Sequence, residues 1–176
     1  IRELKTGDEI EPGTEIKVKE NGFVHLHFPD GSVLRADGNT HFILTEANFD
    51  KRDEKLGVEI KLLAGRLWSK VVALLTPDSH WEVRTTNAVV NVRGTAFGIS
   101  YEDGRSTVIG SENKVVVKSA SEETTVTKDT AVEVENGDIK KLDDLGNILK
   151  ENWIKISKLS DSELEQKIDA LRAKGL

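Results

Sequence analysis

Short runs of alternating hydrophobic and polar residues dominate the first 140 residues of the chain. A period of two places the apolar side chains on one face of a strand and the polar side chains on the other. The pattern therefore predicts strands with one face in the core and one face in solvent. The clearest runs are residues 23–28, 41–44, 58–62, 81–84, 90–92, 114–117 and 131–134.

Glycine-containing dipeptides separate many of these runs. Asp30-Gly31, Asp37-Gly38, Asp103-Gly104 and Asn136-Gly137 tolerate a positive φ at both positions, so we expect a type I′ turn at each. About a dozen short strands, spaced roughly 8 to 12 residues apart, are typical of an all-β fold. We therefore predict a mainly β domain over residues 1–140, with short strands in two layers as a solenoid-like or sandwich arrangement.

The pattern changes near Lys141. A helical stripe follows, at spacings of four, four and three, formed by Leu145, Leu149, Trp153 and Ile156. Ser160 and Glu163 have the spacing of a capping box and indicate the start of a second helix. The sequence therefore predicts a helical C-terminal appendage over residues 141–176.

Composition limits the classes of function. The chain is 37% hydrophobic and 32% charged, with a formal net charge of −6, which predicts a thin core and argues against nucleic acid as a partner. Cysteine is absent, which excludes disulfides and thiolate metal sites. Methionine is absent even at position 1. We therefore expect a piece of a longer protein, with any membrane anchor or export signal upstream of Ile1.

Arg93, Gly94 and Thr95 interrupt an apolar stretch, NVRGTAFGIS, at residues 91–100. A catalytic arginine would need a nucleophile or an acid–base partner, and a phosphate loop would need a lysine and a following helix. The sequence supplies neither near this position. We therefore expect a structural role, in which Arg93 ties adjacent layers, Gly94 allows a close backbone approach and Thr95 makes a local hydrogen bond.

Histidines raise the question of a metal site. His25 and His27 lie two residues apart and so share one face of a strand, where His41 or Asp37 could complete a set of ligands. The apolar residues of the same strand take the inward face. We therefore expect both imidazoles to point to solvent, and we predict neither a metal nor a cofactor.

Carboxylates and tryptophans raise the alternative of carbohydrate binding or processing. The charged segment 46–55 has low periodicity and is expected to form a surface loop, and no glycosidase-like acid pair stands out within it. Trp68 and Trp81 fall in alternating strands, which predicts that they are core or half-buried residues. An exposed aromatic platform would instead favour carbohydrate.

Five short motifs resemble the FecR-type domain in content and order. They are Phe28-Pro29-Asp30-Gly31-Ser32, Asn39-Thr40, Leu63-Ala64-Gly65-Arg66-Leu67-Trp68, Trp81-Glu82-Val83-Arg84-Thr85-Thr86 and Val92-Arg93-Gly94-Thr95-Ala96-Phe97. The resemblance covers about residues 7 to 138. It departs from the family pattern at Asn87, where a proline usually follows the threonine.

The resemblance implies a non-enzymatic, all-β recognition or signal-relay domain outside the cytoplasm, with a protein partner in the cell envelope. In the family's best-known setting this domain relays the occupancy of an outer-membrane transporter to a sigma factor. The anti-sigma segment and the membrane span of that regulator are not in this chain. Two alternatives stay open: a polysaccharide-binding or polysaccharide-processing module, and a structural spacer of a larger surface protein.

Overall fold

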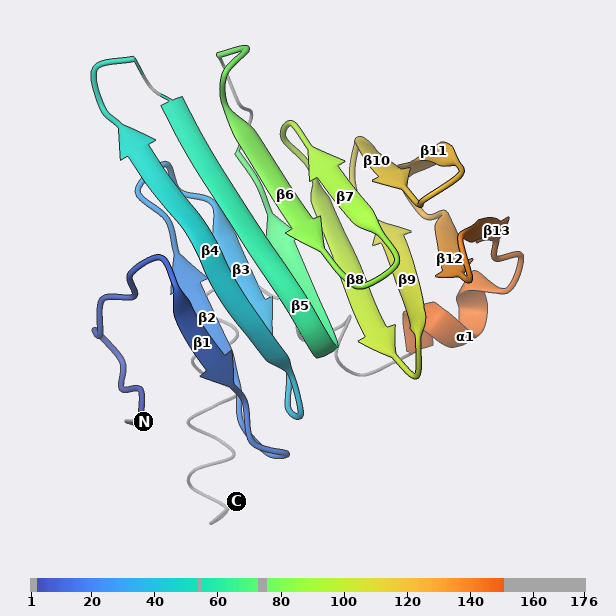
Figure 1. Cartoon of the computed structure of the whole chain (residues 1–176), viewed down its shortest axis with the longest axis horizontal. Coiled ribbons are helices and arrows are strands. Elements are labelled where there is room, and N and C mark those ends of the chain that lie inside the picture. Colours follow the sequence, from blue (N-terminus) through green and yellow to red (C-terminus); the bar gives the residue numbers. More distant parts are fainter. Residues whose placement is uncertain (1–2, 54, 73–75, 151–176) are drawn as a thin grey trace. The chain divides into compact units, whose positions relative to one another are not determined.

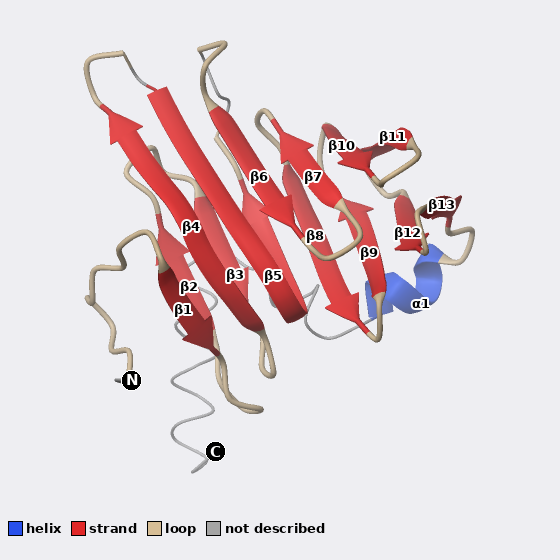
Figure 2. Cartoon of the chain, in the orientation of Figure 1, coloured by secondary structure: helices blue, strands red, loops and turns tan. Residues whose placement is uncertain are grey.

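A computed structural model describes residues 3–53, 55–72 and 76–150 (Figure 1). The chain is mainly β, as predicted, and its thirteen strands form one continuous hydrogen-bonded sheet that folds back on itself (Figure 2). The strands are β1 (Thr14–Lys17), β2 (Val24–His27), β3 (Val33–Ala36), β4 (His41–Asp50), β5 (Lys55–Lys70), β6 (His80–Arg84), β7 (Val89–Val92), β8 (Ala96–Glu102), β9 (Arg105–Gly110), β10 (Lys114–Lys118), β11 (Glu123–Thr127), β12 (Ala131–Glu135) and β13 (Asp138–Lys141).

The strands form two layers that share β5. Layer A has the order β1-β4-β5-β6-β7-β10-β11, and layer B has the order β2-β3-β5-β8-β9-β12-β13. Among the named strands of the described residues, β5 and β6 form the one parallel pair, and all other neighbours are antiparallel. A solenoid would stack its turns in parallel. The solenoid-like arrangement is therefore not confirmed. Successive hairpins alternate between the layers instead: β6–β7 and β10–β11 lie in layer A, and β8–β9 and β12–β13 lie in layer B.

Gly65 lets β5 pass from one layer to the other. Residues 55–64 pair with β4, and residues 67–70 pair with β3. Gly65 has φ of 88°, and a Cβ atom there would lie 2.5 Å from the Cα atom of Thr40. Both the positive φ and the close approach exclude a larger residue. Thr40 fixes this crossing point, because its hydroxyl accepts from the Arg66 N–H at 3.0 Å and donates to the Arg66 carbonyl at 3.1 Å.

The core lies between the inner faces of the two layers. Its largest fully buried side chains include Trp81, Phe42 and Phe97, and the Phe28 ring meets the Trp81 ring edge to face at 4.7 Å. Trp68 is 5% exposed and Trp81 is 0% exposed, so the predicted burial of both is confirmed. Trp68 belongs to the other face of layer B, where the Arg35 guanidinium lies 4.9 Å from its ring centroid.

The predicted type I′ turns are confirmed at two of the four positions. Asp103-Gly104 and Asn136-Gly137 have positive φ at both residues and close the β8–β9 and β12–β13 hairpins. The prediction is wrong at Asp30-Gly31, where Gly31 alone has positive φ, because Pro29 holds a negative φ that suits a type I turn. It is also wrong at Asp37-Gly38, where the positive φ falls on Asn39.

The β unit ends at Leu142, and a second unit begins at Asp143. Lys141 still belongs to β13, one residue past the predicted boundary, and a short helix, α1 (Leu145–Lys150), follows. The longer appendage is not confirmed: Trp153, Ile156, Ser160 and Glu163 lie outside the described residues. In the part of the chain that the structure describes, no helix has the length and apolar character to cross a membrane.

Candidate functional site

The Asp30-Gly31-Ser32 motif attaches the β2–β3 hairpin to the chain that leaves β5. Ser32 is fully buried, and its hydroxyl donates to the Asp30 carboxylate at 2.6 Å. The same hydroxyl oxygen accepts from the backbone N–H of Val72 at 2.9 Å. Asp30 also accepts from the Ser32 N–H at 3.0 Å, which orients the hydroxyl. The polar side chains of this motif thus form hydrogen bonds with each other and with the chain's own backbone.

The Arg93-Gly94-Thr95 motif holds the same segment from another strand pair. The carbonyl of buried Thr95 accepts from the N–H of Val71 at 2.9 Å, and Gly94 has φ of 116°. Arg93 is exposed and its Nη2 atom donates to the carbonyl of Pro77 at 2.7 Å. The side chain therefore points outward and ties a loop, whereas the sequence had led us to expect a tie between two layers.

Both motifs therefore hold the β5–β6 connection, which spans residues 71–79 and is described at 71–72 and 76–79. The connection ends at buried Ser79, whose hydroxyl accepts from the N–H of Leu56 at 3.1 Å and lies 2.6 Å from the Thr76 hydroxyl. The next residue is His80, the first residue of β6. The bond between Ser79 and Leu56, rather than a bond of the signature motifs, places the start of β6 beside the start of β5.

Asn87 makes the tie between layers that we expected of Arg93. It lies in the β6–β7 turn of layer A, and its side-chain nitrogen donates to the carbonyls of Gly104 at 2.7 Å and Val134 at 2.8 Å in layer B. Its side-chain oxygen accepts from the Ser106 hydroxyl at 2.5 Å. The departure from the family's proline is the one sequence signal that pointed to this residue.

The histidines that the sequence offered as metal ligands are not brought together. The rings of His25 and His27 stack with centroids 4.2 Å apart on layer B, whereas His41 lies on layer A with its Nε2 atom 2.6 Å from the Glu15 carboxylate. His27 is exposed, but the Nε2 atom of His25 is buried, so the expectation that both imidazoles point to solvent is wrong for His25.

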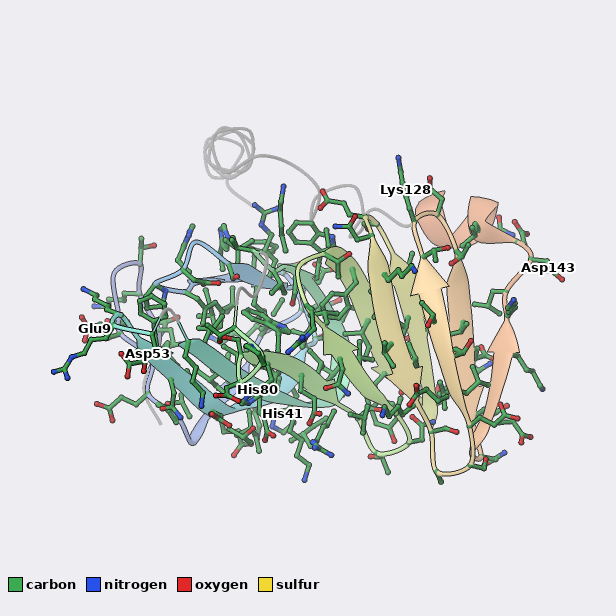
Figure 3. The ribbon with its side chains drawn as sticks, turned by 90° about the horizontal axis from the view of Figure 1, so that it is seen from above. Glu9, His41, Asp53, His80, Lys128 and Asp143 are labelled. Atoms are coloured by element: carbon green, nitrogen blue, oxygen red, sulfur yellow. The ribbon has the colours of Figure 1, made fainter. Side chains whose placement is uncertain are left out.

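A different set of metal-ligating groups converges on the outer face of layer A. Ligand atoms of Glu46, Glu59 and His80 lie within 4.8 Å of one another (Figure 3 labels His80). The Nε2 atom of His80 is 3.2 Å from Oε2 of Glu46. The predicted loop at residues 46–55 is instead the end of β4, a short turn and the start of β5, which is why Glu46 has a fixed place on the sheet.

One edge of layer A is open next to this set. β1 pairs with β4 only over His41–Leu44, so residues 45–50 of β4 have a single strand neighbour, β5, within the described residues. The N–H of Leu56 donates to Ser79 rather than to β4. Leu56 lies directly opposite Phe49 in the β4–β5 pair. Opposite residues of an antiparallel pair exchange either both backbone hydrogen bonds or neither, so Phe49 and Leu56 exchange neither. The N–H groups of Phe49 and, two residues earlier, of Ala47 therefore face the open edge.

Comparisons with known proteins agree with this architecture. A family model described as FecR protein matches residues 14–140. Two crystal structures of a proposed anti-sigma factor from Parabacteroides distasonis ATCC 8503 share the fold, with TM-scores of 0.60 and 0.58 at 24% sequence identity. The alignments cover 73% of this chain and 59% of the matched chains. No curated protein sequence matches the chain. The match over residues 14–140 shows that the chain belongs to the FecR family.

Proposed function

We propose that this domain is a non-enzymatic recognition and signal-relay module that acts outside the cytoplasm and binds a protein partner in the cell envelope. Membership in a family of regulators supports this role. The description of the P. distasonis neighbour as a proposed anti-sigma factor is in keeping with it.

The open edge of β4 is the observation that carries the proposal. An extended segment of another chain can add to such an edge through main-chain hydrogen bonds, with side-chain contacts supplying specificity. The N–H groups of Ala47 and Phe49 are placed to make those bonds, while their side chains pack against the core. The edge has a charged rim at Glu46 and Asp50, which discourages unselective pairing between strands.

The signature motifs have a supporting part in this proposal. Ser32, Arg93 and Thr95 bond to the backbone of the β5–β6 connection and leave the partner surface to other residues. They hold the connection that leads from β5 to β6, while strand pairing holds β6 to β5 and β5 to β4. A rigid sheet behind the edge would let the domain bind without paying for the ordering of a loop.

The carbohydrate alternative has less support. It required an exposed aromatic platform, and the two tryptophans within the β unit are buried. The spacer alternative predicts no partner at this edge, and the experiment below separates it from the relay role.

Site-specific photocrosslinking in cells tests the proposal. A benzophenone amino acid replaces Asp50 at the open edge, and a matched probe replaces exposed Thr125 on β11, the opposite edge strand of layer A. We expect a discrete adduct with an envelope protein from position 50 and none from position 125. Ala47→Pro should abolish the adduct, because it removes an N–H at the edge without removing a bond to β5.

Fractionation of the same cells tests the location, and the domain is expected outside the cytoplasm. Equal adducts from both positions, an adduct that survives Ala47→Pro in folded protein, or recovery of the domain with cytoplasmic proteins would each contradict the proposal. Absence of any adduct would favour the spacer role.

A further inference from the structure

We propose that Glu46, Glu59 and His80 form a binding site for a divalent transition-metal ion, with Zn²⁺ as the best-matched probe. The three residues come from β4, β5 and β6, and their ligand atoms lie within 4.8 Å of one another. This inference does not rest on the proposed function, because it depends only on the outer face of layer A.

The sheet register places these residues together. Glu46 is directly opposite Glu59 in the β4–β5 pair, and Gly57, two residues before Glu59, is opposite His80 in the β5–β6 pair. Ligands on three paired strands are held by the backbone hydrogen bonds of the sheet rather than by a loop. Such a set loses little conformational entropy when it binds an ion.

Gly57 provides the space in which the side chains meet. A Cβ atom at this position would lie 2.5 Å from Oε1 of Glu46 and 2.9 Å from Cε1 of His80. Any other residue would push the carboxylate and the imidazole apart. The strand interior is an unfavourable place for glycine, so its presence beneath the two ligands is an observation separate from the ligands themselves.

Neighbouring polar groups orient the ligands. The side-chain nitrogen of Asn48 donates to Oε1 of Glu46 at 3.0 Å, which leaves Oε2 facing His80. This is the arrangement in which an outer hydrogen bond fixes a metal-binding carboxylate. The Glu82 carboxylate, which lies opposite Glu59 on β6, is paired with Arg84 and is therefore already neutralised.

The charge balance of the set favours a cation. Two carboxylates meet one imidazole, and within residues 3–53, 55–72 and 76–150 Glu59 forms neither a hydrogen bond through its side chain nor an ion pair. Two carboxylates close together repel each other unless a proton or a cation lies between them. The side chains of His80 and Glu46 are 40% and 32% exposed, so an ion can reach them from solvent.

The donor set selects the class of ion. Imidazole nitrogen suits zinc and its first-row neighbours, whereas magnesium and calcium prefer oxygen ligands alone. Zinc bonds of about 2.0 to 2.2 Å place tetrahedral donors about 3.4 Å apart. The 3.2 Å between Nε2 of His80 and Oε2 of Glu46 is close to that spacing. A rotation of the Glu59 side chain would bring its carboxylate oxygen to the same spacing and complete the set of three ligands. Three protein ligands leave a coordination position for water or a partner's side chain.

Calorimetric titration of the untagged, chelator-treated domain with zinc chloride tests the site. We expect one equivalent of Zn²⁺ to bind and to raise the unfolding temperature, while Mg²⁺ and Ca²⁺ do neither at the same concentration. Glu59→Gln and His80→Asn should each weaken zinc binding at least about tenfold. The matched control is His41→Asn, which removes the other imidazole–carboxylate pair of layer A and should leave zinc affinity unchanged.

X-ray absorption of the zinc-loaded domain should report one nitrogen and oxygen ligands at zinc. Circular dichroism establishes that each variant is folded before its affinity is compared. The proposal is overturned if the folded wild-type domain binds no Zn²⁺, if Glu59→Gln and His80→Asn bind it as tightly as wild type, or if His41→Asn abolishes binding. Equal affinity for Ca²⁺ would likewise exclude a site that depends on the imidazole.

Discussion

The side-chain nitrogen of Asn87 donates a hydrogen bond to the carbonyl of Val134 at 2.8 Å, across 47 positions of the chain. Asn87 lies in a turn of layer A and Val134 lies in β12 of layer B. The same amide group also bonds Gly104 and Ser106 of layer B. One side chain therefore joins the β6–β7 turn to two strands of the facing layer.

Replacing this residue should destabilise the domain. Asn87→Ala leaves the carbonyls of Gly104 and Val134 without their donor, and we expect the free energy of unfolding to fall by about 2 kcal/mol. Thr86→Ala, at the exposed neighbouring position, should change it by less than about 0.5 kcal/mol. Urea unfolding of both variants measures the difference. Equal effects from the two substitutions would contradict the interlayer role.

Ser32→Ala should loosen the β5–β6 connection at one identifiable amide. The substitution removes the acceptor of the Val72 N–H but leaves the bond between the Val71 N–H and the Thr95 carbonyl. Amide hydrogen exchange should therefore accelerate more at Val72 than at Val71. Equal acceleration at both would mean that the connection opens as a unit, and no acceleration at Val72 would exclude the assigned hydrogen bond.

Within the Arg93-Gly94-Thr95 motif, the glycine should matter more than the arginine. Gly94→Ala forces a side chain onto a φ of 116°, at a cost of about 1 to 3 kcal/mol. Arg93→Ala removes one hydrogen bond at an exposed position, with an expected loss of about 0.5 to 1.5 kcal/mol. Thermal unfolding ranks the two variants. A larger loss for Arg93→Ala would restore the idea that the guanidinium is the main structural tie.

The Glu15–His41 pair should give a pH-dependent contribution to stability. A hydrogen bond with His41, followed by one with Lys17, holds the pKa of Glu15 below its usual value of 4.5. Because this pKa is lower in the folded state than in the unfolded state, the stabilisation is present at pH values above 4.5. It is lost as the pH falls through the folded-state pKa.

The difference in unfolding temperature between wild type and Glu15→Gln measures this contribution. It should favour wild type at about pH 6 and shrink towards about pH 3. Because Glu15 is exposed, salt should also reduce the difference. A difference that is the same at both pH values would contradict the assignment.

Local pattern predicted the features of the fold that depend on neighbouring residues. Each of the seven clearest alternating runs overlaps a strand, whereas β1, β3, β8, β9, β11 and β13 lie outside those runs. The two dipeptides that directly join paired strands formed the expected I′ turns. The turn prediction failed at Asp30-Gly31, because Pro29 fixes a negative φ that suits a type I turn. The pattern left both a solenoid and a sandwich open, because strand order depends on contacts between distant residues.

The site residues that the sequence missed depend on register. Glu46, Glu59 and His80 were each visible as polar positions in or near strands, but 34 residues separate Glu46 from His80. Only the pairing of β4, β5 and β6 places them side by side. Arg93 was a candidate because it is a charged residue in an apolar stretch. Asn87, in the turn between β6 and β7, makes the interlayer hydrogen bonds.

The sharing of β5 between both layers has a consequence for how the domain folds. β1 to β4 pair with one another or with β5, and β6 and β8 pair with β5 from its other side. Neither β4 nor β3 can pair with β5 before residues 55–70 are available, so assembly must wait for long-range contacts and should be slow compared with that of a helical domain of this size. Until then the early hairpins expose unpaired edges, and a nascent chain would be open to aggregation or to chaperone binding at this stage.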